Sequence, residues 1–350
     1  MTGPDLPPAA LRLGIDREAL AHNWQALDAM SGSAPAGAAV KADGYGLGVD
    51  HVVPALSAAG AREFFVAHWS EVPALLRHVP ADQISVLHGL RNAQEARFAL
   101  ATGVRPVLNS LEQVGHWIGA GGATCHLMVD SGINRLGLPM ADLGDEAIAR
   151  LEVDICMSHL ASADEDSPKN AAQLAAFRSV SSSVRAKRYS LANSAGIALG
   201  TDYAFDLTRP GLSLYGGIAR PELADRIKQV AWPQAAILQM RDLVAGDAVG
   251  YNALFTAAGP MRVATVAIGY ADGFLRCRGP GSALHKDGLA LPILGRVSMD
   301  MIVVDCTGCP EAREGDFLNV PFDLLRNAEA SGLSQYELLT TLGKRFDTTN

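Results

Sequence analysis

Residues 38–48 (A-A-V-K-A-D-G-Y-G-L-G) place a lysine beside groups that could bind an anion. A short apolar run ends at Lys41, and three glycines and Tyr45 follow. Burial at a strand end would favour the neutral amine of Lys41, which is nucleophilic and can form a Schiff base with an aldehyde. The glycines allow close approach of the backbone to an anion, and the Tyr45 hydroxyl could donate to it. An aldehyde beside a phosphate describes pyridoxal phosphate, although a lone strand-end lysine more often reaches into solvent.

Several other strand ends carry candidate residues, and each has a structural alternative. Arg135, in S-G-I-N-R-L-G, could hold a carboxylate through its planar guanidinium, or could be a surface arginine. His159 could stack on a cofactor ring, or could be a core histidine. Ser194 opens a predicted helix, where it could bind a phosphate or simply cap the helix.

Two further segments extend this set. Arg209 precedes Pro210-Gly211, which gives a second cation next to a glycine turn. Tyr270 follows a strand in G-Y-A-D-G and could act as a base if nearby cations lowered its pKa, or could pack under the turn.

The elements that must position these residues alternate between apolar runs and alanine-rich helical stretches. The runs are 38–41, 64–69, 84–88, 104–109, 126–130, 153–159, 189–193 and 207–209. Helices are predicted between them, for example over 51–60, 93–103, 111–119, 140–151 and 171–183. Eight such units predict an α/β fold, a parallel (β/α)₈ TIM-type barrel with its site at the carboxyl ends of the strands.

After residue 230 the pattern changes to short alternating runs separated by turn residues, which predicts an all-β domain. The expected strands are 235–238, 248–251, 262–267, 291–294, 301–304 and 316–320. A helix is expected over 333–342, introduced by Ser334. We therefore expect a pyridoxal-phosphate-binding barrel over 16–229 and a β-rich domain over 230–350 that also includes a strand over 10–15.

Composition narrows the class of protein. The chain has 350 residues, 49% of them hydrophobic, and a net charge of −8, which argues against a nucleic-acid partner. No apolar run reaches the roughly 20 residues that span a bilayer, and no signal peptide is visible, so we expect a cytoplasmic protein without membrane contact. The five cysteines have no framework spacing, and no metal site is expected.

The order of the motifs resembles that of the alanine racemase family over about residues 11–345. The motifs are K-A-D-G-Y-G-L-G, D-S-G-I-N-R-L-G, S-H-L-A-S-A-D-E, N-S-A, R-P-G-L-S-L-Y-G, G-Y-A-D-G and G-R-V-S-M-D. The resemblance implies that Lys41 carries pyridoxal phosphate, with the phosphate held by Tyr45, Ser194 and the backbone at Gly211 and Leu212. It implies that His159 faces the ring, that Arg209 donates to the pyridine nitrogen, and that Arg135 faces the substrate carboxylate.

The same resemblance implies an isomerase that interconverts L- and D-alanine, with Lys41 and Tyr270 as acid–base groups on opposite faces of Cα. Tyr270, Met299 and Asp300 would come from the second subunit of a homodimer with shared active sites. The product would supply D-alanine for cell-wall peptidoglycan, or the enzyme would serve D-alanine breakdown.

The chain departs from the family pattern at several positions, among them Gly44, Leu47 and the tail 345–347, and two further departures concern the proposed site. Met128 stands where many members carry a carbamylated lysine that braces the arginine matching Arg135, and Lys344 stands near a position where some members use a tyrosine. Three alternatives stay open: a broad racemase acting on serine or basic amino acids, a decarboxylase of similar architecture, and a non-catalytic protein that binds pyridoxal phosphate. The decarboxylase motifs E-P-G-R and C-E-S-G-D are missing from the sequence, and the third class resembles the barrel alone.

Overall fold

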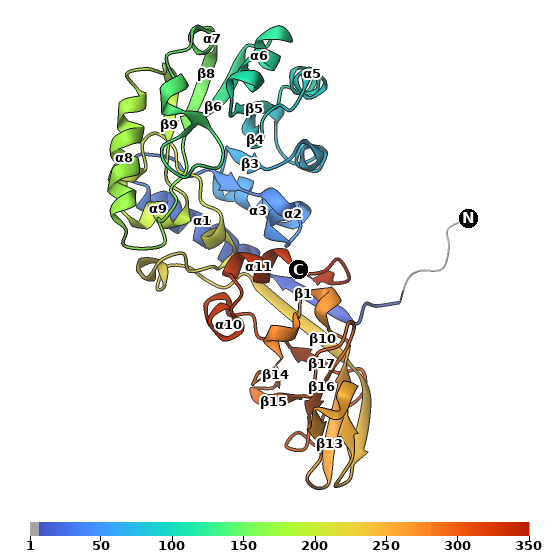
Figure 1. Cartoon of the computed structure of the whole chain (residues 1–350). Helices are drawn as coiled ribbons and strands as arrows, with labels where there is room; N and C mark the ends of the chain where they lie inside the picture. Colours follow the sequence, from blue (N-terminus) through green and yellow to red (C-terminus); the bar gives the residue numbers. More distant parts are fainter. Residues whose placement is uncertain (1–6, 280, 350) are drawn as a thin grey trace, which may run out of the picture. The chain divides into compact units, whose positions relative to one another are not determined.

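The computed structural model describes residues 7–279 and 281–349 of the chain (Figure 1). The chain divides into two compact units. The first, here the barrel unit, is Arg17–Lys228, and the second, here the β unit, combines the N-terminal segment up to Asp16 with Gln229–Asn350. Within the described residues, none of the helices has both the length and the apolar character that a membrane crossing requires.

The barrel unit is built around a parallel sheet. Its strands, in order of pairing, are β2 (Ala38–Ala39), β3 (Phe64–Val66), β4 (Ile84–Val86), β5 (Arg105–Leu108), β6 (Thr124–Asp130), β8 (Glu152–Met157) and β9 (Ala186–Ser190). A short strand, β7 (Leu138–Pro139), pairs with β6. Both β3 and β4 are buried along their whole length, as parallel strands covered on two faces usually are.

The prediction of an eighth strand over 207–209 is wrong, although the same segment closes the ring. The Arg209 N–H donates to Ala192 at 2.8 Å, while Thr208 accepts from Gly37 and Pro210 accepts from Ala39, at 2.8 and 2.9 Å. Pro210 has no N–H to continue a ladder, so the segment makes only an isolated bridge between Ala36 and Thr208. The predicted barrel is therefore confirmed, with an irregular eighth position.

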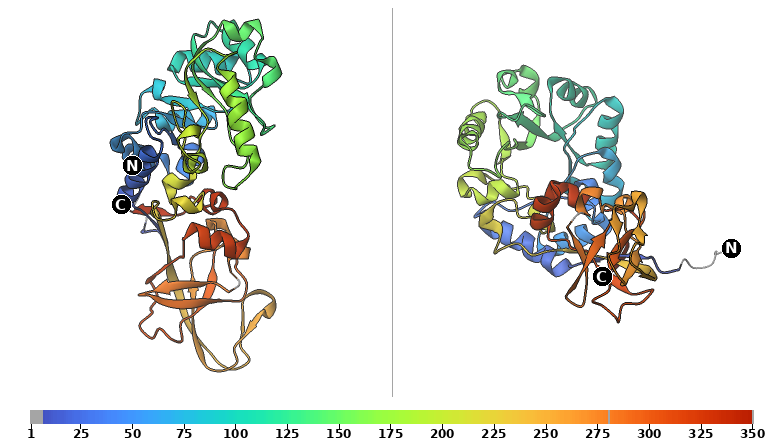
Figure 2. Two further views of the ribbon diagram at one scale, coloured as in Figure 1. Left: turned by 90° about the vertical axis from the view of Figure 1, so that its left-hand side faces the viewer. Right: turned by 60° about the horizontal axis from the view of Figure 1, so that its bottom comes forward.

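Helices surround this sheet, as the right-hand view of Figure 2 shows. They are α1 (Arg17–Met30), α3 (Val49–Ala59), α4 (Val72–Leu75), α5 (Ala93–Thr102), α6 (Leu111–Gly119), α7 (Glu146–Ala149), α8 (Pro168–Val180) and α9 (Ser194–Ala198). Side chains of Asn92, Ser110 and Ser167 cap α5, α6 and α8 by accepting backbone N–H groups. The helix predicted over 140–151 is shorter than expected, because a 3₁₀ turn (Met140–Asp142) and Gly144 precede the single turn of α7.

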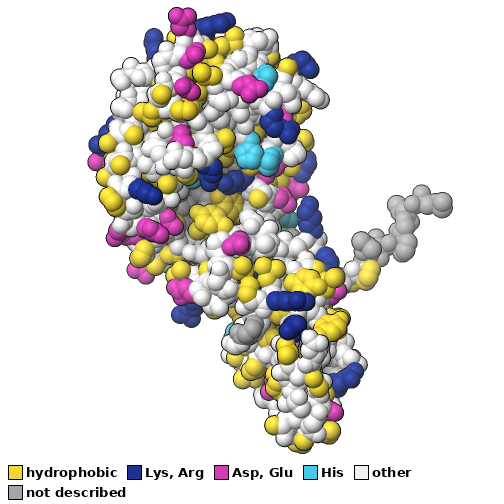
Figure 3. Space-filling view, in the orientation of Figure 1, with side chains coloured by type: hydrophobic (Ala, Val, Ile, Leu, Met, Phe, Trp, Pro, Cys, Tyr) yellow, Lys and Arg dark blue, Asp and Glu magenta, His cyan; other side chains and the backbone are white. Residues whose placement is uncertain are grey.

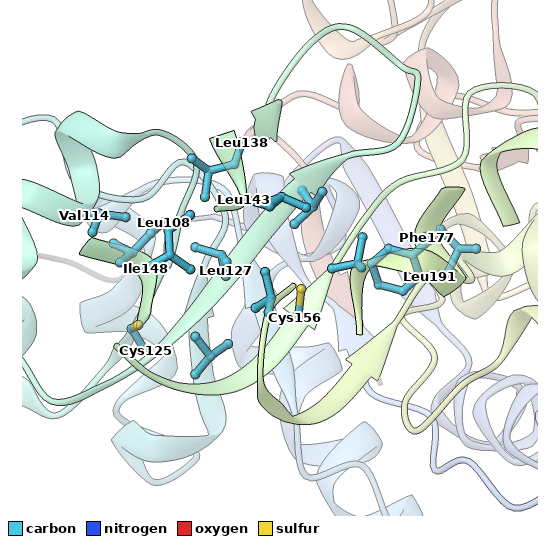
Figure 4. Packing of buried hydrophobic residues seen from close by; sticks show 14 of the residues in the cluster. Leu108, Val114, Cys125, Leu127, Leu138, Leu143, Ile148, Cys156, Phe177 and Leu191 are labelled. Carbon is cyan, nitrogen blue, oxygen red and sulfur yellow. The ribbon is translucent and has the colours of Figure 1, made fainter. Parts of the chain in front are cut away.

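The core of the barrel unit fills the space between the strands and these helices. Figure 4 shows Leu108, Leu127 and Cys156 from the sheet packed with apolar residues of the surrounding elements, including Phe177 of α8. Leu108, Leu127 and Cys156 have no exposed surface. The strands are therefore fixed in place, and with them the loops at their carboxyl ends.

The β unit contains a sheet that closes on itself. Its strands are β1 (Leu11–Ile15), β10 (Ala231–Leu243), β13 (Met261–Val266), β14 (Ala283–Lys286), β15 (Leu289–Leu294), β16 (Ile302–Asp305), β17 (Phe317–Asn319) and β18 (Asp347–Thr349). The long strand β10 pairs with both β17 and β13 and shifts register between Ile237 and Gln239, which closes the ring. Strands β11 (Ala248–Val249) and β12 (Phe255–Thr256) form a separate hairpin sheet.

The predicted strands of this unit are found, and β12, β14 and β18 are additions. The helix expected after Ser334 is α11 (Gln335–Thr340), where Ser334 and Glu337 form a capping box. A second helix, α10 (Leu324–Ser331), was not predicted and is capped by Asp323. The unit is therefore β-rich rather than purely β.

Candidate active site

Lys41 lies directly after strand β2, at the start of a turn with unusual handedness. The strand ends at Ala39, two residues before the predicted position. In the segment labelled α2 in Figure 1 (Lys41–Tyr45), Ala42, Asp43 and Gly44 have φ/ψ of 55°/46°, 55°/53° and 63°/43°. This is left-handed backbone, which costs L-residues roughly 1–2 kcal/mol each. Strain of this kind persists only where surrounding contacts hold it, as at functional sites.

Several contacts hold this turn. Backbone bonds run from Gly44 N to Val40 O at 2.9 Å and from Gly46 N to Ala42 O at 2.9 Å. The Asp43 carboxylate accepts the Val49 N–H at 2.9 Å, which ties the turn to helix α3. A Cβ at Gly44 would lie 2.6 Å from a methyl carbon of Val52, so only glycine fits there.

Charges around Lys41 favour its neutral amine. Burial lowers the pKa of Lys41, and the positive charge of Arg135 lowers it further, while Glu71 opposes the shift. Burial also lowers the pKa of His159 to about 3, helped by Arg209, Arg135 and Lys41. His159 thus lies within electrostatic reach of Arg209, Arg135 and Lys41. The ring of His159 is neutral at physiological pH.

His68 and His88 lie beside the same group. Their rings contact edge to face, with centroids 4.2 Å apart. Burial lowers the pKa of His88, and the charges of His68 and Lys41 add to this effect. Figure 3 shows histidine side chains next to Lys or Arg side chains on this face of the barrel unit. His88 is the last residue of the predicted strand 84–88, whereas His68 was not selected from the sequence.

A cradle of hydroxyl and backbone groups is formed by Tyr45, Ser194, Gly211, Leu212 and Ser213. The Ser194 hydroxyl, at the start of α9, accepts N–H groups of Gly211 at 2.9 Å and Ser213 at 3.2 Å. A Cβ at Gly211 would lie 2.3 Å from the Tyr45 hydroxyl oxygen, so that hydroxyl lies against the Gly211 backbone. Leu212 is buried and begins the 3₁₀ turn Leu212–Tyr215.

The Tyr45 ring has a fixed position in this cradle. It stacks on Tyr215 with centroids 4.6 Å apart, and the Tyr215 hydroxyl donates to the carbonyl of Ala39 at 2.8 Å. Both aromatic rings are thereby anchored to the end of the strand that leads to Lys41.

The cradle has the chemistry that a phosphate requires. Its groups are hydroxyls and peptide N–H groups, which donate to anions. The Ser213 hydroxyl is fully buried and has no hydrogen-bond partner among the described residues. Because Gly211 has no side chain, the Tyr45 hydroxyl can lie against its backbone. An anion that accepted from Ser213 would satisfy this hydroxyl, so the residues present fit the phosphate of pyridoxal phosphate.

Arg209 is the most deeply buried cation of this group. Burial lowers the pKa of Arg209 to about 10, so the guanidinium stays charged at neutral pH. It donates to the Ser158 carbonyl at 2.5 Å and to the Ser190 hydroxyl. Both acceptors are uncharged.

Arg135 lies in an exposed loop whose backbone is held by the carboxylate of Asp130. One oxygen of Asp130 accepts the N–H groups of Gly132, Ile133 and Asn134 at 2.8, 2.9 and 3.2 Å. Met128, which is 6% exposed, lies under the same loop, with its Cγ 3.1 Å from the position of a Cβ at Gly137. The loop that carries Arg135 is therefore ordered by Asp130, the last residue of the predicted strand 126–130, where an aspartate before S-G is a turn signal.

The β unit brings Tyr270, Met299 and Asp300 together. Tyr270 N donates to Ser298 O at 3.1 Å, and Ala271 N donates to Met299 O at 3.0 Å. The guanidinium carbon of Arg276 lies 5.2 Å from the centre of the Tyr270 ring.

Arg345 joins the turn of Tyr270 to the segment that contains Asp300. Its guanidinium donates to the carboxylates of Asp272 and Asp300, both at 2.7 Å. Arg345 was not selected from the sequence, and Lys344 beside it is exposed.

These features define a barrel protein with a lysine and, in the same unit, a cradle of hydroxyl and backbone N–H groups, together with a β unit in which a turn carries Tyr270. The description "Alanine racemase, N-terminal domain" matches residues 15–219, and "Alanine racemase, C-terminal domain" matches residues 230–350. The chain belongs to the alanine racemase family.

Relatives cover the whole chain. It is 42% identical to the alanine racemase of Rhizobium meliloti (strain 1021), over 100% of this chain and 99% of the relative. It is 41% identical to the biosynthetic alanine racemase of Agrobacterium fabrum, over 97% of this chain and 93% of the relative. The crystal structure of alanine racemase from Bartonella henselae with covalently bound pyridoxal phosphate is similar, with a TM-score of 0.90, 34% identity and coverage of 98% and 99%.

Proposed function

We propose that this protein is a pyridoxal-phosphate-dependent isomerase that interconverts L-alanine and D-alanine. The observation that carries the proposal is the lowered pKa of the Lys41 amine, in the same unit as a cradle of hydroxyl and N–H groups. The relatives named above carry this activity in their names, and the Bartonella henselae relative holds the cofactor covalently. The barrel, proposed over 16–229, is the cofactor-binding domain.

The cradle residues divide the binding of the cofactor between them. Tyr45, Ser194 and the backbone at Gly211 and Leu212 hold the phosphate. When bound, the cofactor supplies an aldehyde that condenses with the Lys41 amine with loss of water, and a conjugated ring that stabilises negative charge on Cα. His159 faces the ring as a neutral imidazole.

Arg209 donates a hydrogen bond to the pyridine nitrogen. Because a guanidinium does not release its proton, Arg209 would leave the pyridine nitrogen unprotonated, which would limit the electron withdrawal that the ring supplies. Return of a proton to Cα is therefore favoured over side reactions such as transamination.

Two groups move the proton at Cα. Lys41 Nζ serves one face and the Tyr270 hydroxyl serves the other, so that either enantiomer can lose a proton to one group and gain one from the other. Arg135 binds the substrate carboxylate and holds Cα between them.

The active form is a homodimer in which Tyr270, Met299 and Asp300 reach the barrel of the other copy. In that case, mixing inactive Lys41→Ala and Tyr270→Phe chains restores activity, because one of the two sites in a mixed dimer is complete. About one quarter of wild-type activity is expected after random reassociation. No recovery after exchange of subunits would contradict a shared site.

The proposed mechanism makes Lys41 indispensable. Lys41→Ala removes racemisation, while Lys187→Ala, which alters an exposed lysine paired with Glu152, leaves it unchanged. Racemisation by Lys41→Ala without an added amine would contradict the mechanism. Comparable rates with serine, lysine or arginine would instead identify a broad racemase.

The biological role is D-alanine supply for peptidoglycan or D-alanine breakdown. Relatives named for each role, the biosynthetic and the catabolic enzymes of Agrobacterium fabrum, are both 41% identical to this chain. A cytoplasmic location stays a prediction.

A further inference from the structure

We propose that Glu71 is the positioning residue of Lys41: its carboxylate captures the N–H of Ala42 and so sets the point at which the chain leaves strand β2 and turns left-handed. The inference rests on the proposed role of Lys41 as the amine that binds the cofactor. Glu71 ends the 3₁₀ turn Trp69–Glu71 that follows strand β3, so it reaches Lys41 from the neighbouring strand.

The first line of support is the interrupted ladder between β2 and β3. Ala38 N donates to Glu63 O at 2.7 Å, and Val40 N donates to Phe65 O at 2.9 Å. A regular parallel ladder would continue from Ala42 N to Ala67 O. Here the Ala42 N–H is directed to the Glu71 carboxylate at 2.6 Å, while the Ala67 carbonyl accepts from His88 N at 3.1 Å. Glu71 therefore takes over the next rung and allows the chain to turn.

The second line of support is the number of groups that this carboxylate binds. Its other oxygen accepts the N–H groups of Ala67 and His68 at 2.8 and 2.9 Å. Three backbone donors on one carboxylate form short, charge-assisted bonds that fix its orientation. Because two donors belong to the end of β3 and the third belongs to the residue after Lys41, Glu71 ties the Lys41 turn to the sheet.

The third line of support is the conformation that must be held. Ala42 and Asp43 are not glycines, yet both have φ of 55°. Without the bond from Glu71, the Ala42 N–H loses its partner, and the segment gains freedom to return to ordinary backbone geometry. That change would alter the direction in which the Lys41 side chain leaves the sheet.

The charge of Glu71 acts on the same amine. The charged and titratable groups around Lys41 are Arg135 after β6, His88 after β4, His68 after β3, His159 after β8, and Glu71. Glu71 is the anion of this set, and its charge raises the pKa of Lys41 against burial and Arg135. Removal of the charge lowers the pKa of Lys41 further, whereas a purely structural role for Glu71 predicts no such change.

The test compares Glu71→Gln with Glu95→Gln. Glu95 is a matched control, since its carboxylate also accepts a backbone N–H, from Arg91 at 2.7 Å, but it lies on α5 away from this group. In protein without cofactor, competitive acylation at a series of pH values, followed by mass spectrometry of the Lys41 peptide, gives the titration of its amine. In a second assay, pyridoxal phosphate is added, and its attachment to Lys41 is trapped with borohydride and followed in time.

We expect Glu71→Gln to shift the Lys41 titration to lower pH and to slow covalent attachment about tenfold, equivalent to about 1.4 kcal/mol. Glu95→Gln should change neither value. A Lys41 titration and an attachment rate equal to those of the wild type in Glu71→Gln would overturn the proposal.

A second variant separates reach from charge and serves if Glu71→Gln does not fold. Glu71→Asp keeps the charge but shortens the side chain by one methylene group. It should slow attachment while leaving the Lys41 titration closer to that of the wild type, and wild-type attachment would contradict the positioning role. These readouts do not depend on racemisation: a wild-type protein that does not racemise alanine, together with a shifted Lys41 titration in Glu71→Gln, would refute only the proposed function.

Discussion

The turn that carries Lys41 in the barrel unit and the turn that carries Tyr270 in the β unit are both held by a carboxylate, but in different ways. Glu71 reaches the Lys41 turn from the neighbouring strand and binds three backbone N–H groups. Asp272 lies within the Tyr270 turn itself, accepts the Gly269 N–H at 3.0 Å, and is paired with Arg345 near the chain end.

The difference shows how each residue is supported. The Lys41 turn depends on the order of the parallel strands, so the barrel itself sets its position. The Tyr270 turn depends on an ion pair with the C-terminal segment, and Arg345 extends that pair to Asp300. We therefore expect changes in the barrel unit to affect cofactor binding first, and changes in the β unit to affect stability and the tyrosine.

The largest expected effect follows from filling the cradle. Gly211→Ala would place a methyl group 2.3 Å from the Tyr45 hydroxyl oxygen, although the φ of −133° at Gly211 suits any residue. Such overpacking costs about 1–3 kcal/mol, which weakens the affinity for pyridoxal phosphate roughly 10- to 100-fold. Equilibrium dialysis measures this. Gly119→Ala in α6, with open space around its Cβ, is the control, and equal affinities for the two variants would contradict the cradle.

The corresponding change in the β unit is Asp272→Asn. Asp272 is 1% exposed, and the amide keeps only one acceptor oxygen for two donors. We expect a loss of about 1–3 kcal/mol in the free energy of unfolding, measured by urea titration. Asp323→Asn, at the exposed cap of α10, should cost less, and the reverse order would show that the buried carboxylate does not hold the Tyr270 turn.

The barrel unit should also be the more acid-sensitive region. Burial lowers the pKa of His126 to about 3, as it does for His159, and the unfolded value is about 6.5. Below pH 6.5 these histidines bind protons in the unfolded chain but not yet in the folded protein. The free energy of unfolding therefore decreases as the pH is lowered, by up to about 1.4 kcal/mol per pH unit for each histidine, until the pKa of the folded state is reached.

Urea unfolding of the cofactor-free protein at pH 7.5 and 5.5 measures this loss. His126→Asn should reduce the difference between the two pH values, and an unchanged difference would rule out His126 as a source of it.

The smallest expected effect is at Arg345, which is half-exposed and pairs with Asp272 and Asp300. Arg345→Lys keeps the positive charge but loses the planar fork that joins Asp272 and Asp300. Because Arg345 and Asp300 are 49% and 47% exposed, we expect a loss below about 1 kcal/mol in the free energy of unfolding. A thermal or urea transition lowered as much as in Asp272→Asn would place the main support on Arg345 instead.

The sequence predicted those parts of the molecule that depend on local patterns. Apolar runs located the parallel strands, Ser334 located the start of α11, and the glycine-rich segment after Lys41 located a turn. The left-handed backbone of Ala42 and Asp43 was not predictable, because alanine disfavours it, aspartate adopts it only occasionally, and distant contacts hold the turn.

The supports of the site were also missed. Glu71 and Arg345 act on backbone or side chains that only the folded chain brings near them. The strand expected at 207–209 failed because Pro210 interrupts the ladder, although the ring closes there. The roles assigned to Lys41, Tyr270 and the cradle residues stay predictions.

Isotope exchange at Cα tests the proposed function most directly. The protein loaded with pyridoxal phosphate is incubated with L-alanine in deuterated water, and loss of the α-proton is followed by NMR together with chiral analysis of the product. The two-base assignment of Lys41 and Tyr270 predicts exchange accompanied by D-alanine, much faster than with other L-amino acids, and loss of both in Lys41→Ala. Bound cofactor without exchange on alanine would contradict it.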